Sequence, residues 1–460
     1  GLMLMAAWMG DRATRLISIL SVALLVAAAF VAAAPPGGYA VGYDGMYRAD
    51  AFAGFTKLLM FLAAAVAVII APGFFARTEG GALRAEYPVL ILLSSAGMGA
   101  MASAGDMLTL YVGLELQSLA AYVLASFMRR DTRSAEAGLK YFVLGALASG
   151  ILLYGISLIY GFTGTTTFAG IRLALSAGLS TGQLFGMVFI LAGVAFKVAA
   201  VPFHMWTPDV YEGAPTPVTA FFASAPKVAA MALLVRVTIE AMGPATDSWR
   251  QIVIFSALAS TVLGGVGAIG QTNVKRLLAY SSINNVGFAL FGLVPGTAEG
   301  VAGVLTYMAV YIVMTLGSFL VVLQMRGPDG RQVEEIRALS GMATTRPGLA
   351  AAMAMFMFSL AGIPPLFGFW PKFVVFDSVV AAGYWPLAMV GIATSVIGAY
   401  YYLRVVKTMY FDAAETRFPP VENKVEGALI AAGAVAISPI GYFLIPMLGA
   451  TSLAAAQSLF

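Results

Sequence analysis

The 460-residue chain has no cysteine and only one histidine, His204, and only 10% of its residues are charged. Without thiolates it cannot form a disulfide or hold an iron–sulfur cluster, and one histidine excludes bis-histidine haem ligation. Soluble domains are about 25% charged and about 45–50% apolar, whereas this chain is 60% hydrophobic. The composition therefore excludes an ordinary soluble enzyme, a disordered protein and a nucleic-acid-binding protein, and it predicts a polytopic helical membrane protein.

Apolar runs long enough to cross a bilayer, at roughly 20 residues each, recur along the whole chain. They lie near 14–33, 51–75, 86–104, 106–127, 137–162, 183–203, 217–242, 251–270, 277–295, 300–325, 347–368, 384–410 and 426–449. Residues 1–10 are a shorter apolar stub. We interpret it as the end of a first helix rather than as a signal peptide, because no positive segment precedes it. The predicted fold class is all-α and transmembrane, with about 14 helices.

The loops between these runs differ in charge. Counting the stub as the first helix, the even-numbered loops carry only Arg48, Arg172 and Arg250, and the odd-numbered loops carry clusters of arginine and lysine. Because positive loops stay in the cytoplasm, we expect the odd-numbered loops there. Residues 163–182 are predicted to be a loop or a short interfacial helix on the outer side. No loop is long enough for a nucleotide-binding or redox domain.

Two pairs of runs indicate an internal repeat. FKVAAVP from Phe196 aligns without a gap with FSLAGIP from Phe358, and LTLYVGLELQSLAAYVLASFM from Leu108 aligns with LTYMAVYIVMTLGSFLVVLQM from Leu305. We take the members of each pair to be five spans apart, so that the two halves are inverted in the membrane. Inverted repeats with broken helices are typical of transporters, whereas the alternative is that the prolines only kink the helices.

The repeat predicts a division of the chain into four parts. These are N-terminal helices over 1–104, a first half-channel over 105–242 with the adjoining helix 86–104, a second half-channel over 250–410, and a C-terminal loop and helix over 411–460.

Charged side chains inside apolar runs are the candidate functional residues, because each costs roughly 2.5–3.5 kcal/mol at the centre of a membrane helix. They are Glu115, Lys197, Lys227, Lys372 and Lys140. A desolvated lysine can release and take up a proton. The alternatives are structural ion pairs and, for Lys140 near the cytoplasmic end of its run, snorkelling to the interface.

Other polar residues are secondary candidates. His204, which follows the first break, and Asp377, five residues after Lys372, are possible relay groups, whereas we expect Lys57 and Arg236 to snorkel. One carboxylate with several lysines in separate runs lacks the carboxylate cluster of a metal site and the activated nucleophile of a hydrolase. The pattern favours proton translocation. Sodium binding fits less well, because lysine repels a cation.

Four runs closely resemble subunit N of bacterial NADH–quinone oxidoreductase, respiratory complex I. They are EAGLKYFVLGALASG (136–150), FKVAAVPFHMWTPDVYEGAPTPV (196–218), NVKRLLAYSSINNVGF (273–288) and LAGIPPLFGFWPKF (360–373). The resemblance covers nearly the whole chain. It implies two inverted half-channels of about five helices each and a location in the bacterial inner membrane. It also implies that the chain forms a hetero-oligomer with the other membrane subunits of complex I. Redox chemistry would belong to other subunits, with no cofactor in this chain.

The resemblance also implies roles for individual residues. Glu115 would be the glutamate of the fifth helix, and Lys140, Lys197, Lys227 and Lys372 would be the lysines of the sixth, seventh, eighth and twelfth helices.

The chain departs from the family at Asn285, where members often carry a histidine. An asparagine can hold a water molecule but cannot take up a proton near pH 7, so a connection between the half-channels would run through water here. Two other functions remain open from the sequence. One is a subunit of a stand-alone cation/proton antiporter, and the other is a membrane scaffold whose charges only join helices.

Overall fold

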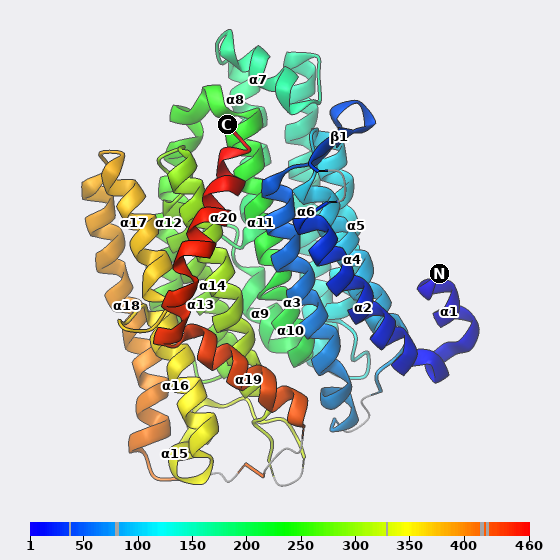
Figure 1. The fold of residues 1–460 in the computed structure, drawn as a ribbon, viewed down its shortest axis with the longest axis vertical. Helices are drawn as coiled ribbons and strands as arrows, with labels where there is room; N and C mark the ends of the chain where they lie inside the picture. Colours follow the sequence, from blue (N-terminus) through cyan, green and yellow to red (C-terminus); the bar gives the residue numbers. More distant parts are fainter. Residues whose placement is uncertain (36–37, 79–81, 328–329, 415–417, 420–422) are drawn as a thin grey trace.

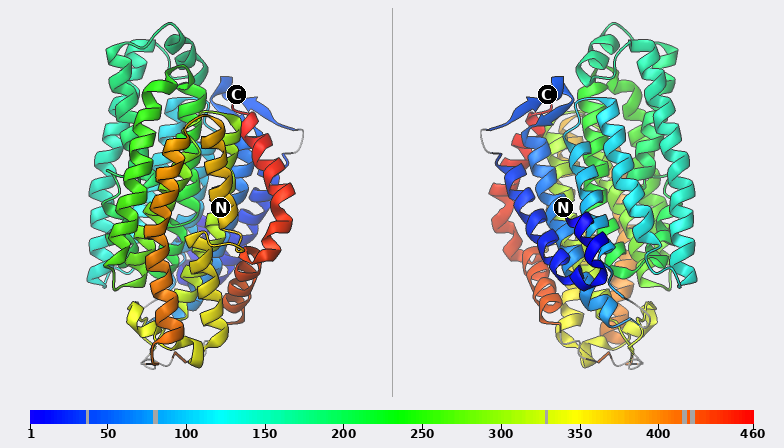
Figure 2. Two further views of the ribbon diagram at one scale, coloured as in Figure 1. Left: turned by 90° about the vertical axis from the view of Figure 1, so that its left-hand side faces the viewer. Right: turned by 90° about the vertical axis from the view of Figure 1, so that its right-hand side faces the viewer.

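The structure, a computed structural model, describes residues 1–35, 38–78, 82–327, 330–414, 418–419 and 423–460. Its long helices run close to one common direction and form a single bundle (Figures 1 and 2). Among the described residues, 10 helices are long and apolar enough to cross a membrane. The predicted polytopic helical membrane fold is therefore confirmed.

The helices occupy most of the chain. In order they are α1 (Leu2–Met9), α2 (Thr14–Ala33), α3 (Ala51–Ala76), α4 (Glu86–Ala102), α5 (Met107–Ala125), α6 (Thr132–Thr163), α7 (Phe168–Ser176), α8 (Thr181–Val198), α9 (Trp206–Gly213), α10 (Thr216–Phe222), α11 (Ala225–Arg236), α12 (Thr246–Ile269), α13 (Val274–Phe291), α14 (Ala298–Leu323), α15 (Met342–Thr345), α16 (Pro347–Ala361), α17 (Phe369–Ala381), α18 (Trp385–Phe411), α19 (Lys424–Ile437) and α20 (Ile445–Gln457). Two short antiparallel strands, β1 (Ala40–Gly42) and β2 (Tyr47–Ala49), form a hairpin.

The number of spans in the described residues is lower than the predicted figure of about 14. The runs expected at 86–104 and 347–368 form shorter apolar helices, α4 and α16, and α13 is not among the 10 candidates. The N-terminal stub forms α1, which joins α2 through a turn at Gly10 with a φ of 58°. The left-handed Gly362 ends α16 within the run expected at 347–368, and α1 and α2, which were expected as two spans, count as the single candidate Leu2–Ala33.

The two ends of the bundle are different. The β1–β2 hairpin, α7 and the C-terminus lie at one end, and α15 lies at the other (Figure 1). The hairpin and α7 belong to even-numbered loops, so they mark the end that the loop charges assign to the outside. The helix α7 agrees with the short helix expected within 163–182. The hairpin was not predicted, because strands of three residues are too short to show an alternating pattern.

Both proline-containing breaks have the same construction. The helix α8 ends where Ala199 takes a left-handed φ of 65°, and α16 ends where Gly362 takes a φ of 81°. The next helices begin at Trp206 and Phe369. The left-handed residues (199 and 362) and the starts of the next helices (206 and 369) are each separated by 163 residues between the two breaks. The ungapped alignment assumes a separation of 162 residues. That alignment is wrong by one residue, because the second half offers two consecutive prolines and the match selected the first.

The two aligned pairs of runs differ in whether their helices point in opposite directions. The helix α8 begins at the α7 end of the bundle and α16 begins at the α15 end, so the broken helices are inverted as predicted (Figure 1). The second pair is not inverted. The helix α5 begins beside Thr166, whose carbonyl accepts a hydrogen bond from the amide of Met107.

The helix α14 begins at this same end. The turn η4 (Gly243–Ala245), which leads into α12, packs against α7. Because α12 runs away from α7 and α13 returns, α14 starts there again and runs parallel to α5. The alignment of Leu108 with Leu305 therefore joins helices six spans apart instead of five, and this prediction is wrong.

Candidate functional site

Lys197 lies in the last turn of α8 and faces α5. Its side chain is buried, and its Nζ donates to Ser118 Oγ at 2.7 Å and to Tyr122 Oη at 3.3 Å. The left-handed Ala199 ends the helix two residues later, so the lysine stands at the break. The prediction placed Lys197 beside a disrupted helix, and the structure agrees.

Glu115 lies on α5 almost one turn before Ser118. Its Oε1 atom is buried and accepts no hydrogen bond from the described residues. The carboxylate is close enough to act on Lys197 electrostatically, while the hydrogen bonds of the ammonium go to Ser118 and Tyr122. Glu115 therefore shares one face of α5 with Ser118 and Tyr122, the two residues whose hydroxyl groups bind Lys197.

Lys227 lies in the first turn of α11 and is 1% exposed. Its Nζ donates to the carbonyl oxygen of Val198 at 2.9 Å, and it lies 5.4 Å from the ring centre of Trp206 and 5.8 Å from that of Tyr211. Val198 is the residue that follows Lys197. Lys227 therefore binds the C-terminal end of α8, one residue beyond Lys197, where helical carbonyls lack a partner within the helix.

Lys372 has the corresponding position at the second break. Its Nζ donates to the carbonyl oxygens of Leu360 at 3.1 Å and Ala361 at 2.9 Å, in the last turn of α16. It also lies 4.4 Å from the ring centre of Phe288 on α13. The exposed Asp377 shares with it a cavity of about 400 Å³ between α17 and α18.

Asn285 lies in a buried polar network between the two breaks. Its Nδ2 donates to the Ser281 carbonyl at 2.8 Å and to Tyr402 Oη at 3.1 Å, and its Oδ1 accepts from Tyr307 Oη at 2.7 Å. The hydroxyl groups of Ser281 and Tyr402 also bond to each other. The amide uses both its donor and its acceptor atoms, so it orients the surrounding hydroxyls but does not itself carry a proton.

His204 lies in the segment between α8 and α9. The ring is half-buried, and its Nδ1 has no hydrogen-bond partner among the described residues. The structure places it after the first break, as predicted. The hydrogen bonds of Lys197 and Lys227 go to other groups.

Lys140 lies apart from the other candidate lysines. Its Nζ contacts Asp209 Oδ2 at 2.8 Å and Glu136 Oε1 at 2.6 Å, and its side chain is 42% exposed. These residues line a pocket of about 160 Å³ at the α15 end of the helices, together with Arg276. Lys140 therefore belongs to a charged cluster at the end assigned to the cytoplasm.

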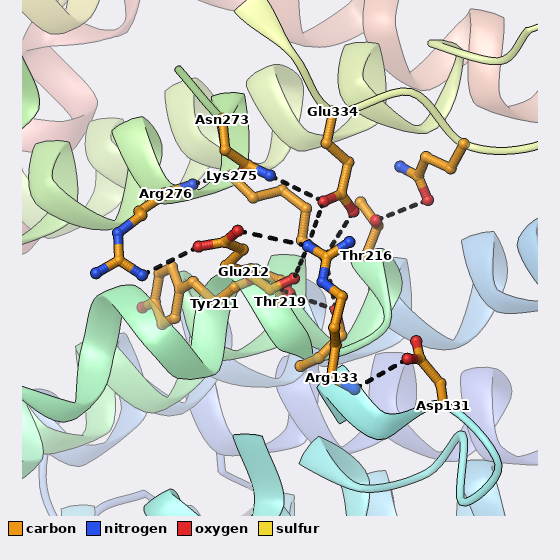
Figure 3. Close-up of polar contacts among 12 residues, drawn as sticks. Asp131, Arg133, Tyr211, Glu212, Thr216, Thr219, Asn273, Lys275, Arg276 and Glu334 are labelled. Carbon is orange, nitrogen blue, oxygen red and sulfur yellow. Dashed lines mark hydrogen bonds and ion pairs between the residues drawn. The ribbon is translucent and has the colours of Figure 1, made fainter. Parts of the chain in front are cut away.

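This charged cluster was not predicted from the sequence. Glu334, in the segment after α14, contacts Arg133 at 2.9 Å and Lys275 at 3.1 Å. Arg276 contacts both Asp209 and Glu212 on α9, and Figure 3 shows its contact with Glu212. The cluster joins α6, α9, α13 and the segment after α14. The sequence signal for this cluster was the presence of charged residues in the segments WTPDVYEG (206–213) and NVKR (273–276). A single sequence cannot show which of these charges face each other.

The expectation that Lys57 and Arg236 snorkel is wrong. Arg236 is fully buried and pairs with Asp50 at 2.8 Å and with Glu240 at 3.0 Å. Lys57 is 7% exposed and donates to Tyr47 Oη at 2.8 Å and to Ser103 Oγ at 2.6 Å. The reason is the unpredicted hairpin, because β2 and the residue after it bring Tyr47 and Asp50 over this end of the bundle.

Within the described part of the chain, no group of three or more His, Asp or Glu residues is arranged to hold a metal ion.

Comparison with known proteins gives a consistent result. The family model described as "NADH:quinone oxidoreductase/Mrp antiporter, TM" matches residues 104–398. The chain is 72% identical to NADH-quinone oxidoreductase subunit N of Rhizorhabdus wittichii over 460 residues, covering 100% of this chain and 95% of the relative. It is 60% identical to the same subunit of Sphingopyxis alaskensis, covering 100% of this chain and 96% of the relative.

Solved structures show the same similarity. A chain of respiratory complex I from Thermus thermophilus matches with a TM-score of 0.82 and 32% identity, over 97% of this chain and 96% of that one. A chain of the Mrp complex from a Dietzia species has a TM-score of 0.83 over 97% of this chain and 93% of its own, at 23% identity. This second likeness shows the fold alone.

Proposed function

Because the chain belongs to the family of NADH-quinone oxidoreductase subunit N, we propose that it moves protons across the membrane through its buried lysines. It is a proton-translocating, multi-pass subunit of this complex in the bacterial inner membrane, and its partners are the other membrane subunits. NADH oxidation and quinone reduction belong to other subunits, and we propose that this chain carries no redox cofactor.

The contact of Lys227 with Val198 is the observation that carries the proposal for the first half-channel, over 105–242. Lys227 Nζ binds the carbonyl of the residue that follows Lys197, while Lys197 Nζ binds hydroxyl groups of α5, and both lysines are buried. A buried ammonium group is costly, so a proton passes readily from one lysine to the other when the surrounding charge changes. Glu115 supplies such a charge beside Lys197.

The second half-channel, over 250–410, receives the proton through the network around Asn285. Asn285 orients the hydroxyl groups of Tyr307 and Tyr402, and water molecules bonded to them connect the two lysine sites. Lys372 then releases the proton into the cavity that it shares with Asp377. Lys140 and His204 act on the cytoplasmic side of the first break, where protons enter.

Replacing Lys227 with glutamine tests this proposal. The variant and a matched control, Lys424→Gln, are made in the native complex, because Lys424 is an exposed lysine on the cytoplasmic side. NADH oxidation and proton translocation are measured in sealed membrane vesicles. We expect Lys227→Gln to lower translocation by roughly tenfold or more, the result of removing a group that acts in proton transfer, while Lys424→Gln matches the native complex. Unchanged translocation per NADH would count against Lys227 as a relay.

The scaffold alternative predicts a different result for a double variant. If the charges only join helices, Glu115→Gln combined with Lys197→Gln leaves translocation intact in assembled complex. The proposal predicts assembly with translocation lost. For the antiporter alternative, the chain is tagged at its C-terminus and purified from gently solubilised membranes. NADH–quinone reduction that travels with the tag supports the proposal, whereas membrane partners without this activity favour a stand-alone antiporter.

A further inference from the structure

The short helix α9 carries two kinds of side chain. The rings of Trp206 and Tyr211 are buried and lie 5.4 Å and 5.8 Å from Lys227 Nζ. The carboxylates of Asp209 and Glu212 are half-buried and contact the cations of the charged cluster. The position of this helix therefore determines the surroundings of Lys227.

Arg276 holds the acidic face of α9. Its Nη1 donates to Asp209 Oδ1 at 2.7 Å and to Glu212 Oε2 at 3.0 Å. Figure 3 shows the guanidinium of Arg276 pointing toward α9 from the start of α13. Such charge-assisted hydrogen bonds are shorter and roughly twice as strong as neutral ones. One side chain therefore connects α13 to both carboxylates.

The helix α13 also reaches the second lysine site. Three turns beyond Arg276 it carries Phe288, whose ring centre lies 4.4 Å from Lys372 Nζ, and on the way it carries Asn285. A helix transmits displacement along its length because its backbone hydrogen bonds keep it stiff. Arg276 therefore connects α9, which carries the rings around Lys227, to α13, which carries the ring beside Lys372.

The position of α9 depends on side-chain contacts more than that of a long helix does. It has only 8 residues, and irregular segments precede and follow it. At its start, Trp206 Nε1 donates to the Phe196 carbonyl at 2.9 Å, and after its end Lys275 Nζ donates to the Ala214 carbonyl at 2.7 Å. Between these two ends, the ion pairs of Asp209 and Glu212 hold the body of the helix.

Two other cations of the cluster also contact the carboxylates of Asp209 and Glu212. Lys140 contacts the second oxygen of Asp209 at 2.8 Å, and Arg133 lies 3.6 Å from Glu212. Both belong to α6, in the first half of the chain, as α9 does. Within the cluster, Arg276 therefore makes the direct side-chain ion pairs between α9 and the second half.

We infer that Arg276, acting through Asp209 and Glu212, is a positioning residue that fixes the aromatic surroundings of Lys227 relative to those of Lys372. This inference rests on the proposed function, because it gives the two lysines coupled roles in proton translocation. Arg276 itself touches neither lysine, so its effect is on their geometry.

The test uses Arg276→Gln and Arg276→Lys in the native complex. Lys407→Gln is the matched control, because it also removes a cation of the same end of the bundle from an ion pair, in this case with the neighbouring Asp412. Proton translocation per assembled complex is measured in vesicles over a range of pH. We expect Arg276→Gln to lower translocation by roughly threefold or more and to move its pH optimum. Arg276→Lys restores at least half of the rate, and Lys407→Gln matches the native complex.

A merely structural role gives a distinguishable result. If Arg276→Gln lowers the amount of assembled complex, but each complex keeps the native rate and pH profile, the positioning role is overturned. Lys227→Gln is measured in parallel. If it also translocates normally, the proposed function fails. If it stops translocation while Arg276→Gln leaves rate and pH profile unchanged, only the role of Arg276 fails.

Discussion

Gly362 is the position at which one added methyl group tests the place of Lys372. It follows α16 with a φ of 81°, a left-handed conformation that costs roughly 1–2 kcal/mol for a residue with a Cβ. A Cβ at this position would lie 2.8 Å from Cδ of Lys372 and 3.1 Å from its Nζ. Ordinary contact begins at 3.4 Å, so Cδ must move from 2.8 Å to 3.4 Å, a shift of about 0.6 Å.

A shift of this size changes the bonding of the ammonium group. Its Nζ donates to the Ala361 carbonyl at 2.9 Å and to the Leu360 carbonyl at 3.1 Å, so it would move to the limit of hydrogen bonding. A hydrogen bond to a charged group contributes about 1.5–3 kcal/mol, and each 1.4 kcal/mol or so corresponds to about tenfold in a rate. We therefore expect Gly362→Ala to slow proton translocation by about tenfold.

Gly383→Ala is the matched control. Gly383 has a φ of 87°, and an added Cβ meets no atom within 4 Å. Both variants carry the same backbone cost, but only Gly362→Ala displaces Lys372. Thermal unfolding of the purified complex and translocation per complex are measured for both. We expect similar losses of stability and a loss of translocation in Gly362→Ala alone. Equal translocation by the two variants would refute the placement of Lys372 on these carbonyls.

Three further predictions concern other charged and polar sites. Arg236→Met removes a fully buried cation from Asp50 and Glu240, so that Glu240 keeps only its contact with Arg48, and it lowers the free energy of unfolding by about 3–5 kcal/mol. The exposed Arg172→Met changes this free energy by no more than about 0.5 kcal/mol, and equal thermal midpoints would contradict the prediction. Burial raises the pKa of Glu334, but its ion pairs with Lys275 and Arg133 outweigh burial and hold the pKa below its usual range. Its contribution to stability is therefore present above the usual glutamate pKa and lost as pH falls through the lowered one, so the difference in thermal midpoint between the native chain and Glu334→Gln shrinks only in strong acid. Asn285→His retains translocation, because an imidazole can accept the bond from Tyr307, and adds a pH dependence near about 6.5, whereas Asn285→Leu loses translocation.

The fold class followed from the sequence because a membrane span is a local property of about 20 residues. The lysines at 197, 227 and 372 were identifiable for a similar reason, since a charge inside an apolar run is costly wherever the run packs. The partners of these charges were not identifiable. The pairing of Arg276 with Asp209 depends on α9 lying against α13, and the burial of Arg236 depends on a hairpin whose strands are too short to predict.

The corrected register of the repeat explains why no lysine recurs between the two halves. With positions 163 residues apart in correspondence, Val198 corresponds to Ala361, and each carbonyl accepts a lysine hydrogen bond at 2.9 Å. The donors differ, because Lys227 comes from α11, beyond α9, and Lys372 comes from α17, directly after the break.

This shared contact has a physical cause. A helix that ends inside a membrane leaves its last carbonyls unpaired at the negative end of its dipole, and these carbonyls must be satisfied within the protein. An ammonium group meets both requirements from whichever neighbouring helix can reach the carbonyl. The two halves therefore need a lysine at the same place in space but not at the same place in sequence. Accordingly, Lys197 corresponds to Leu360, and Lys372 corresponds to Asp209.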